Sequence, residues 1–160
     1  MKNNFSERRI KLSDKDLEDS AIIVASASVK ARISDTDYAY RQDSNFYYLS
    51  GYEEPDSLLL IRPNSDKEKF IIFCRDRDPL REQWDGFRTG QEGAVQQYGA
   101  DNAYSINSLD QMMPDLLAGV KNIYFSMSAP CGVDIKISHW MEDIRKNTRA
   151  GAEPPPTIDT

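Results

Sequence analysis

Few side chains in this chain have a type and spacing that could do chemistry. A nucleophilic triad needs a histidine, or an equivalent base, held by an acid. The only histidine is His139, next to Trp140 in a segment with helical periodicity. A lone histidine of this kind is expected to be a surface or partly buried side chain. The residues alone therefore predict no catalytic site.

Metal-binding and phosphate-binding patterns are equally weak. The sequence has no His-x-x-x-His, Cys-x-x-Cys or DxDxDG pattern, and the glycines at positions 86, 90 and 93 match neither a dinucleotide fingerprint nor a phosphate loop. The acidic pairs Asp76/Asp78 and Glu53/Glu54 could bind a cation, but solvated loop charge is the interpretation we favour. We therefore expect no metal site and no cofactor within this chain.

Composition and charge indicate one soluble globular domain. The 160 residues are 39% hydrophobic and 29% charged, and the net charge of -6 argues against a nucleic-acid surface. The early apolar run from Ala21 to Ala27 falls short of the roughly 20 residues of a membrane helix and does not look like a signal peptide. Cys74 and Cys131 are expected to be buried, reduced thiols. We expect a cytoplasmic protein without membrane or nucleic-acid partners.

Three apolar runs predict the centre of the fold: Phe46–Leu49, Leu58–Ile61 and Phe70–Phe73. Runs this short, rich in aromatic and aliphatic residues and bounded by turn formers, are typical of strands covered on both faces. The links between them are too short for a helical crossover, so we predict an antiparallel meander.

The remaining segments predict helices on both sides of a sheet. Further strands are expected at Ala21–Ala25, Ala103–Ser105 (an edge strand) and Asn122–Met127, and helices at Phe5–Asp19, Gln91–Tyr98, Ser108–Gly119 and Val133–Asn147. Val29–Asp37 is expected to be a polar loop, and Arg75–Gly93 a long, charged, irregular excursion. The predicted fold class is α/β: a three-layer domain with a mixed β-sheet, an antiparallel meander at its centre and flanking helices.

The end of the chain has a different composition. Residues 149–160 contain three consecutive prolines and no apolar periodicity, which is typical of an extended, semi-rigid linker. We therefore expect a domain over residues 1–148, followed by a linker to a further domain.

The segment YRQDSNFYYLSGYEEPDSLLLIRP resembles the signature of the amino-terminal domain of aminopeptidase P, the Xaa-Pro aminopeptidases of the creatinase/prolidase type. The similarity continues through Arg75-Asp76-Arg77-Asp78 and Glu82–Gly90, and onward to Pro156. A string with so many fixed aromatic, charged and glycine positions is a specific match. It implies the amino-terminal fold of that superfamily, which has a ribonuclease H-like motif.

The resemblance also implies a function for a longer protein. Enzymes of this family release an amino-terminal residue when proline is second, using a dinuclear metal site, typically manganese, in a carboxy-terminal "pita-bread" domain. The ligands are two Asp, one His and two Glu of that domain, so we expect this chain to be inert as a peptidase. Implied partners are the catalytic domain, other subunits of a homo-oligomer and the Xaa-Pro peptide.

In this family the amino-terminal domain supports oligomer assembly and lends residues to the rim of the substrate cleft, in some members that of a neighbouring subunit. The positions here that match the rim residues are Asp35 and Trp84. An acidic group could attract the substrate ammonium, and a loop tryptophan could cover an apolar side chain. A turn cap for Asp35 and a packing role for Trp84 are equal alternatives, although the charged neighbours of Trp84 favour exposure.

Three residues of the signature are expected to be structural: Arg41, Gly51 and Pro55. Arg41 precedes the expected central strand, where a guanidinium can bridge several carbonyls or a carboxylate. Two functions stay open: the accessory domain of a Xaa-Pro aminopeptidase, and a stand-alone binding module that keeps this fold without peptidase activity. The proline-rich end favours the first.

Overall fold

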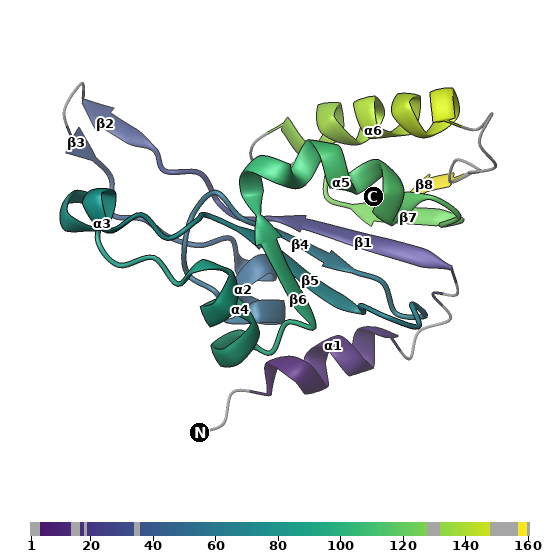
Figure 1. Cartoon of the computed structure of the whole chain (residues 1–160), viewed down its shortest axis with the longest axis horizontal. Helices are drawn as coiled ribbons and strands as arrows, with labels where there is room; N and C mark the ends of the chain where they lie inside the picture. The colour runs from purple at the N-terminus through teal and green to yellow at the C-terminus, as the bar shows by residue number, and fades with distance from the viewer. Residues whose placement is uncertain are drawn as a thin grey trace.

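A six-stranded mixed β-sheet, with helices on both faces, forms the frame of the chain (Figure 1). This computed structural model describes residues 4–13, 17, 19–33, 36–127, 132–147 and 157–159. The sheet has the order β6-β5-β4-β1-β7-β8, and β2 and β3 form a separate ribbon. The strands are β1 (Ser20–Ala25), β2 (Ala31–Ile33), β3 (Thr36–Asp37), β4 (Leu58–Ile61), β5 (Phe70–Cys74), β6 (Asn102–Ser105), β7 (Asn122–Phe125) and β8 (Thr157–Asp159).

Six α-helices and one 3₁₀ turn are found in the described part of the chain. They are α1 (Phe5–Ser13), α2 (Ser44–Ser50), α3 (Pro79–Asp85), α4 (Gly90–Tyr98), η1 (Ile106–Ser108), α5 (Leu109–Leu117) and α6 (Val133–Asn147). Among the described residues, no helix combines the length and the apolar character that crossing a membrane requires.

The directions of the strands bring most strand ends to one edge of the sheet. Strand β4 runs antiparallel to both β1 and β5, whereas the pairs β1/β7, β5/β6 and β7/β8 are parallel. Five of the six strands therefore run the same way, and their carboxyl ends meet at one edge. Loops at such an edge often carry the functional residues of α/β proteins.

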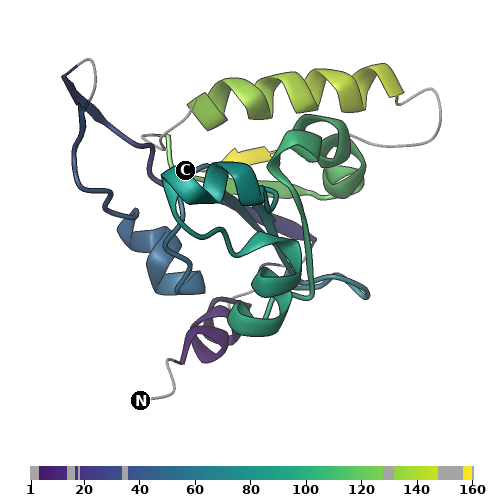
Figure 2. The same ribbon diagram turned by 60° about the vertical axis from the view of Figure 1, so that its left-hand side comes forward.

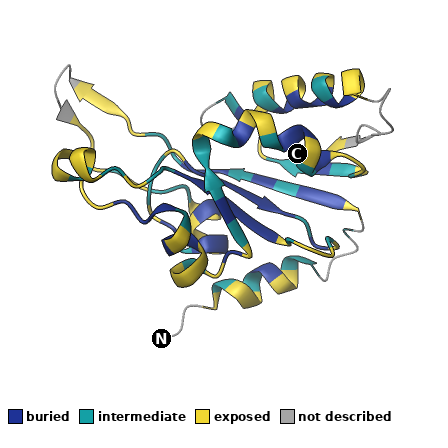
Figure 3. Cartoon of the chain, viewed as in Figure 1, coloured by how far each residue is buried: buried dark blue, intermediate teal, exposed yellow. Residues whose placement is uncertain are grey.

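Each face of the sheet has its own core (Figures 2 and 3). On one face α5 and α6 pack on alternate strand residues, and Trp140 and Met113 are among the fully buried side chains. On the other face α1, α2 and α4 cover β4, β5 and β6, with Phe46 and Tyr52 completely buried. The structure therefore has three layers, with the second face covered only in part.

The predicted fold class is confirmed: a mixed sheet is flanked by helices, and its centre is antiparallel. The helix predicted at Val133–Asn147 has those bounds, and its predicted apolar face is the buried one: Val133, Ile137, Trp140, Met141 and Ile144. Clear 3.6-residue periodicity explains this agreement. The edge strand expected at Ala103–Ser105 is β6, which does lie at an edge.

The strand predicted for Phe46–Leu49 is wrong, because this run lies in helix α2. The carboxylate of Asp43 caps the helix by accepting hydrogen bonds from the backbone N–H groups of Asn45 and Phe46 at 2.9 and 3.0 Å. Phe46 and Leu49 lie about one turn apart and face the core, while the two tyrosines between them are exposed. The predicted three-stranded meander is thus reduced to the β4–β5 hairpin, and β1 completes the antiparallel centre.

Gly51 ends α2 in the left-handed conformation, with φ of 70°. Its N–H donates to the carbonyl of Tyr47 at 2.8 Å, which closes the last turn. A Cβ at this position would lie 2.4 Å from Cε2 of Phe5. The left-handed backbone conformation therefore favours glycine, and any larger residue would also have to displace the ring of Phe5.

Two segments expected to be irregular contain regular structure. The segment Val29–Asp37, expected to be a loop, holds the β2–β3 ribbon. The excursion after β5 contains α3, because Asp78 caps the helix through the N–H groups of Leu80 and Arg81, both at 3.2 Å, and Pro79 occupies its first turn. A cap followed by proline is a helix-start signal within an otherwise charged stretch.

The predicted linker, residues 149–160, is described only over Thr157–Asp159. These residues form β8, which extends the sheet by pairing with β7. Cys131 lies outside the described residues. Cys74 is a buried free thiol, as expected.

Candidate functional site

The helix α3 presents an unusual amount of apolar surface. Trp84 is 88% exposed, Leu80 77% and Phe87, just beyond the helix, 65%. Large apolar side chains that gather at the surface without covering a core mark contact surfaces. Trp84 is exposed, as its charged neighbours indicated, and Leu80 and Phe87 are members of the same surface that the sequence did not reveal.

The segment that carries these side chains, residues 75–89, is held by ionic contacts, and we call it the α3 excursion. Arg77 forms two hydrogen bonds with Glu82, at 2.6 and 3.0 Å, and its guanidinium lies 4.6 Å from the ring centroid of Phe87. The hydrogen bond from Arg77 lowers the pKa of Glu82 below its usual value. These contacts shape the α3 excursion without burying its apolar residues.

Glu54 joins the two ends of the α3 excursion. One carboxylate oxygen accepts a hydrogen bond from the N–H of Thr89 at 2.7 Å, and the other accepts from Arg75 at 3.3 Å. Asp76 adds a second attachment, because it accepts from Gln91, Ser105 and Asn107 at 2.9, 2.6 and 3.2 Å. These hydrogen bonds hold both ends of the excursion at the edge of the sheet.

The expectation of solvated loop charge is therefore wrong for three of the four acidic residues. Asp76 and Glu54 are half-buried hydrogen-bond acceptors, and Asp78 is the cap of α3. Glu53 alone is exposed as expected. Glu54 and Asp78 accept hydrogen bonds from backbone N–H groups, and Asp76 accepts them from side chains. The sequence pattern could not distinguish such acceptors from free charge.

A polar cavity of about 720 Å³ lies beside α3. Four arginines and four aspartates line it: Arg75, Arg77, Arg81, Arg88, Asp56, Asp76, Asp78 and Asp85. Because the two signs balance, and Arg81 and Arg88 pair with Asp78 and Asp85, the cavity has no strong net field for one kind of ion. Among the described residues, no group of three or more His, Cys, Asp or Glu side chains is placed to hold a metal. The dinuclear metal centre implied by the resemblance thus has no ligand set in this part of the chain.

The signature residue with a bridging role is Gln42 rather than Arg41. Arg41 is exposed, so the expectation of a buried guanidinium is wrong. The amide oxygen of Gln42 accepts from the N–H groups of Ala27 and Asp43 at 2.9 and 2.8 Å, and its amide nitrogen donates to the carbonyls of Tyr52 and Glu54 at 3.2 and 3.0 Å. A neutral amide suits this place because it has both donors and acceptors, whereas a guanidinium has only donors.

Asp35, the other predicted rim residue, lies outside the described residues. The flanking strands β2 and β3 belong to the segment 27–42, which we call the β2–β3 arm. This arm projects from the same end of the sheet as α3 in Figure 1. The predicted roles of Asp35 and Trp84 at a substrate cleft stay predictions.

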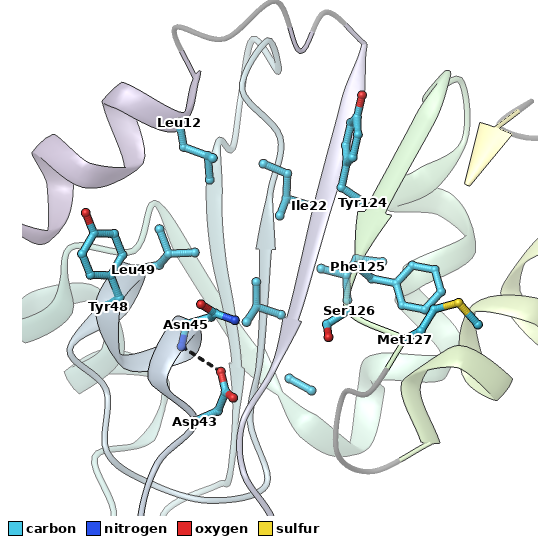
Figure 4. Close-up of a pocket in the computed structure, with 13 residues that line it drawn as sticks. Leu12, Ile22, Asp43, Asn45, Tyr48, Leu49, Tyr124, Phe125, Ser126 and Met127 are labelled. Carbon is cyan, nitrogen blue, oxygen red and sulfur yellow. Dashed lines mark hydrogen bonds between the residues drawn. The ribbon is translucent and has the colours of Figure 1, made fainter. Parts of the chain in front are cut away.

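An apolar groove of about 730 Å³ runs along the uncovered part of the second sheet face (Figure 4). Leu12 and Tyr48 lie on one side of it, Tyr124 and Met127 on the other, and Ile22 of β1 lies between them. The carboxylate at its end, Asp43, is already engaged as the cap of α2. The groove is therefore a surface for packing rather than for bond-making chemistry.

Two titratable groups are buried under the segment that carries Glu54. Burial raises the pKa of the Cys74 thiol to about 11, although a contact with Tyr52 opposes the shift. Burial also raises the pKa of the Tyr52 phenol, reinforced by Cys74 and Glu54. Both groups are therefore neutral at physiological pH, and neither is a nucleophile. His139 is exposed on α6, as expected of a surface histidine.

Comparison with known proteins identifies the family. Residues 5–124 match the family described as "Aminopeptidase P, N-terminal domain". The chain belongs to this family. The α3 excursion and the β2–β3 arm lie within the matched residues.

Similar proteins and structures cover almost the whole chain. The chain is 41% identical over 123 residues to a Xaa-Pro aminopeptidase of Haemophilus influenzae, covering 77% of this chain and 29% of that protein. It is 30% identical over 158 residues to a Xaa-Pro aminopeptidase of Escherichia coli, covering 98% and 36%. The structure of Pseudomonas aeruginosa aminopeptidase PepP superposes with a TM-score of 0.95 at 37% identity, covering 100% of this chain and 36% of that one. The chain thus spans about a third of the length of these relatives.

Proposed function

We propose that this chain is the non-catalytic amino-terminal domain of a Xaa-Pro aminopeptidase, and that the surface of α3 forms part of the rim of the substrate cleft and of the contacts that assemble the oligomer. The observation that carries this proposal is the exposure of Trp84, Leu80 and Phe87 in a chain whose relatives are Xaa-Pro aminopeptidases. Exposed aromatic side chains on a braced segment suit a surface that closes over a peptide or another subunit.

The proposal leaves the chemical step to residues outside this chain. A zinc-substituted E. coli aminopeptidase P in complex with product is among the similar solved structures, so that enzyme can hold a metal. The described residues here offer no cluster for such a metal. We propose that a dinuclear centre, with manganese as the metal, belongs to the remaining two thirds of the complete enzyme, in the cytoplasm.

The test compares the 160-residue chain with the protein made from the complete gene. We expect the chain alone to release no amino-terminal residue from a Xaa-Pro peptide in the presence of manganese. In the complete protein, Trp84→Ala should lower turnover by about tenfold or more, since one poorly placed substrate contact has that order of effect. The bound metal should stay unchanged.

The matched control is Ile135→Ala on α6, an apolar side chain that is 62% exposed on another surface. This variant should keep full turnover. Metal-dependent peptidase activity of the isolated chain would overturn the proposal. Equal turnover of the Trp84→Ala and Ile135→Ala proteins would show that α3 is not part of the cleft rim. A complete gene that encodes no metal ligands would favour a stand-alone binding module.

A further inference from the structure

Two segments leave the sheet at the same edge and in the same direction. The β2–β3 arm (residues 27–42) follows β1, and the α3 excursion (residues 75–89) follows β5. Since β1 and β5 both run antiparallel to β4, they run parallel to each other, and both segments start at the same edge. Figure 1 shows both projecting beyond the left end of the sheet.

Gln42 closes the base of the β2–β3 arm. Its amide oxygen accepts from the N–H of Ala27, which lies at the other end of the arm, at 2.9 Å. The hydroxyl of Tyr40 adds a hydrogen bond to the carbonyl of Ala27 at 3.3 Å. Higher in the arm, the N–H of Tyr38 donates to the carbonyl of Lys30 at 2.9 Å. The two legs of the arm are therefore held together from the base upward.

Glu54 closes the base of the α3 excursion in the same way. Its carboxylate contacts Arg75 at one end, at 3.3 Å, and the N–H of Thr89 at the other, at 2.7 Å. The carboxylate is only 16% exposed, so water competes weakly for these hydrogen bonds.

The two closures share one piece of backbone. The amide nitrogen of Gln42 donates to the carbonyl of Tyr52 at 3.2 Å and to the carbonyl of Glu54 itself at 3.0 Å. We call the three residues from Tyr52 to Glu54 the bracket. The carbonyls of Tyr52 and Glu54 hold the arm, and the side chain of Glu54 holds the excursion.

The bracket is itself firmly seated in the core. Tyr52 is 0% exposed, and its ring lies 4.9 Å from that of Tyr98 and 6.4 Å from that of Phe46. Just beyond the bracket, Ser57 and Ser26 exchange hydrogen bonds at 2.9 Å, which ties the segment to the end of β1. Because core packing fixes the position of the bracket, both projecting segments are attached to the same rigid point.

We propose that Gln42 and Glu54 are positioning residues that fix the β2–β3 arm and the α3 excursion relative to each other, so that their exposed side chains meet one substrate peptide together. The inference rests on the proposed function for what the two segments contact. The argument for positioning stands on the geometry alone, because neither side chain fills the apolar core. Gln42 joins the arm to the bracket through two hydrogen bonds, and Glu54 joins the bracket to both ends of the excursion.

The test measures the distance between the two segments in the 160-residue chain. Spin labels are attached at Lys30→Cys on the arm and Leu80→Cys on the excursion, both exposed positions, in a Cys131→Ser background. Cys74 is buried and unlabelled under native conditions. Pulsed dipolar spectroscopy then gives the distribution of distances. We expect one narrow distribution in the otherwise unaltered chain.

Gln42→Ala and Glu54→Ala should each broaden the distribution by about twofold or more, as expected when a braced segment opens locally. Gln42→Glu keeps the oxygen for Ala27 but loses both donors to the bracket, so it should broaden the distribution as well. Glu54→Gln keeps an oxygen for the N–H of Thr89 but loses the acceptor for Arg75, so it should broaden the distribution less than Glu54→Ala does. Arg41→Ala and Glu53→Gln, at the exposed neighbouring positions, are the matched controls and should change nothing.

A distribution that stays narrow in the Gln42 and Glu54 variants overturns the proposal. Equal broadening in the two control variants overturns it as well, because the effect would then be general. If both Gln42 variants or both Glu54 variants fail to fold, that residue supports the whole fold rather than the two segments, and the proposal fails for it. Since no substrate enters this measurement, its result is independent of whether Trp84→Ala changes turnover in the complete enzyme.

Discussion

The two tryptophans of this chain lie in opposite environments. Trp140, on α6, is 1% exposed and donates its indole N–H to Asp110 at 3.0 Å. Trp84, on α3, is 88% exposed and is flanked by charged residues. The same side chain therefore serves as part of a core in one region and as free surface in the other.

The difference shows how each region keeps its shape. The layer of α5 and α6 is fixed by burial of apolar side chains against the sheet, which is the dominant source of stability. The α3 excursion buries little and is fixed by charged hydrogen bonds at its ends. A region of the second kind can present large apolar side chains to a partner without losing its own structure.

The largest effect is expected for Trp140→Ala. Removal of a buried tryptophan leaves a cavity, so the free energy of unfolding should fall by about 3–5 kcal/mol. Denaturant unfolding followed by circular dichroism measures this loss. A loss of less than about 1 kcal/mol would contradict the role of Trp140 as a core residue.

Asp110 tests the polar side of the same region. It accepts hydrogen bonds from Lys136 and from Trp140. Burial alone would raise the pKa of Asp110, but these hydrogen bonds outweigh it and lower the pKa from its usual 3.8. A carboxyl with a lower pKa in the folded chain stabilises the fold above its unfolded pKa, and this stabilisation is lost as the pH falls through the folded pKa.

Asp110→Asn should therefore lower the free energy of unfolding at neutral pH by no more than about 0.5 kcal/mol, since the ion pair with Lys136 is largely exposed and screened. The difference from the unaltered chain should vanish in acid, below the lowered pKa of Asp110. Urea unfolding at a series of pH values measures it. Asp115→Asn, on the exposed side of α5, is the control, and a difference that grows in acid would contradict the assignment.

The smallest effect on stability is expected for Trp84→Ala, within about 0.5 kcal/mol, because an exposed side chain loses little on truncation. Acrylamide should quench the fluorescence of Trp84 readily and that of Trp140 weakly. Variants in which one tryptophan is replaced at a time would separate the two signals. A Trp84→Ala chain that unfolds, or a Trp84 signal protected from acrylamide, would show that α3 packs against the body of the domain.

The sequence predicted the elements with the clearest apolar pattern. The face of α6 follows from its helical periodicity, and the strands β4 and β5 follow from short, continuous apolar runs between turn formers. Helix α2 was missed, because four apolar residues between polar ones suit a short strand as well as a helix. The capping carboxylate of Asp43 was the signal that decides between them.

The candidate site was predictable only in part. Charged neighbours indicated the exposure of Trp84, but the same reasoning gave no sign of Gln42 and Glu54. Their partners are backbone groups of Ala27 and Thr89, far away in sequence, and no local pattern encodes such contacts. The hydrogen bonds that hold a projecting segment can therefore be identified only from the folded structure.

The position of β1 has a consequence for the time course of folding. This strand lies near the beginning of the chain, yet it pairs with β4 on one side and with β7, beyond α5, on the other. Contacts so distant in sequence form slowly, because a long loop must close before they are gained. During synthesis β1 therefore lacks its partner on one edge until Asn122–Phe125 has emerged, and an unpaired strand edge of this kind can associate with the wrong strand.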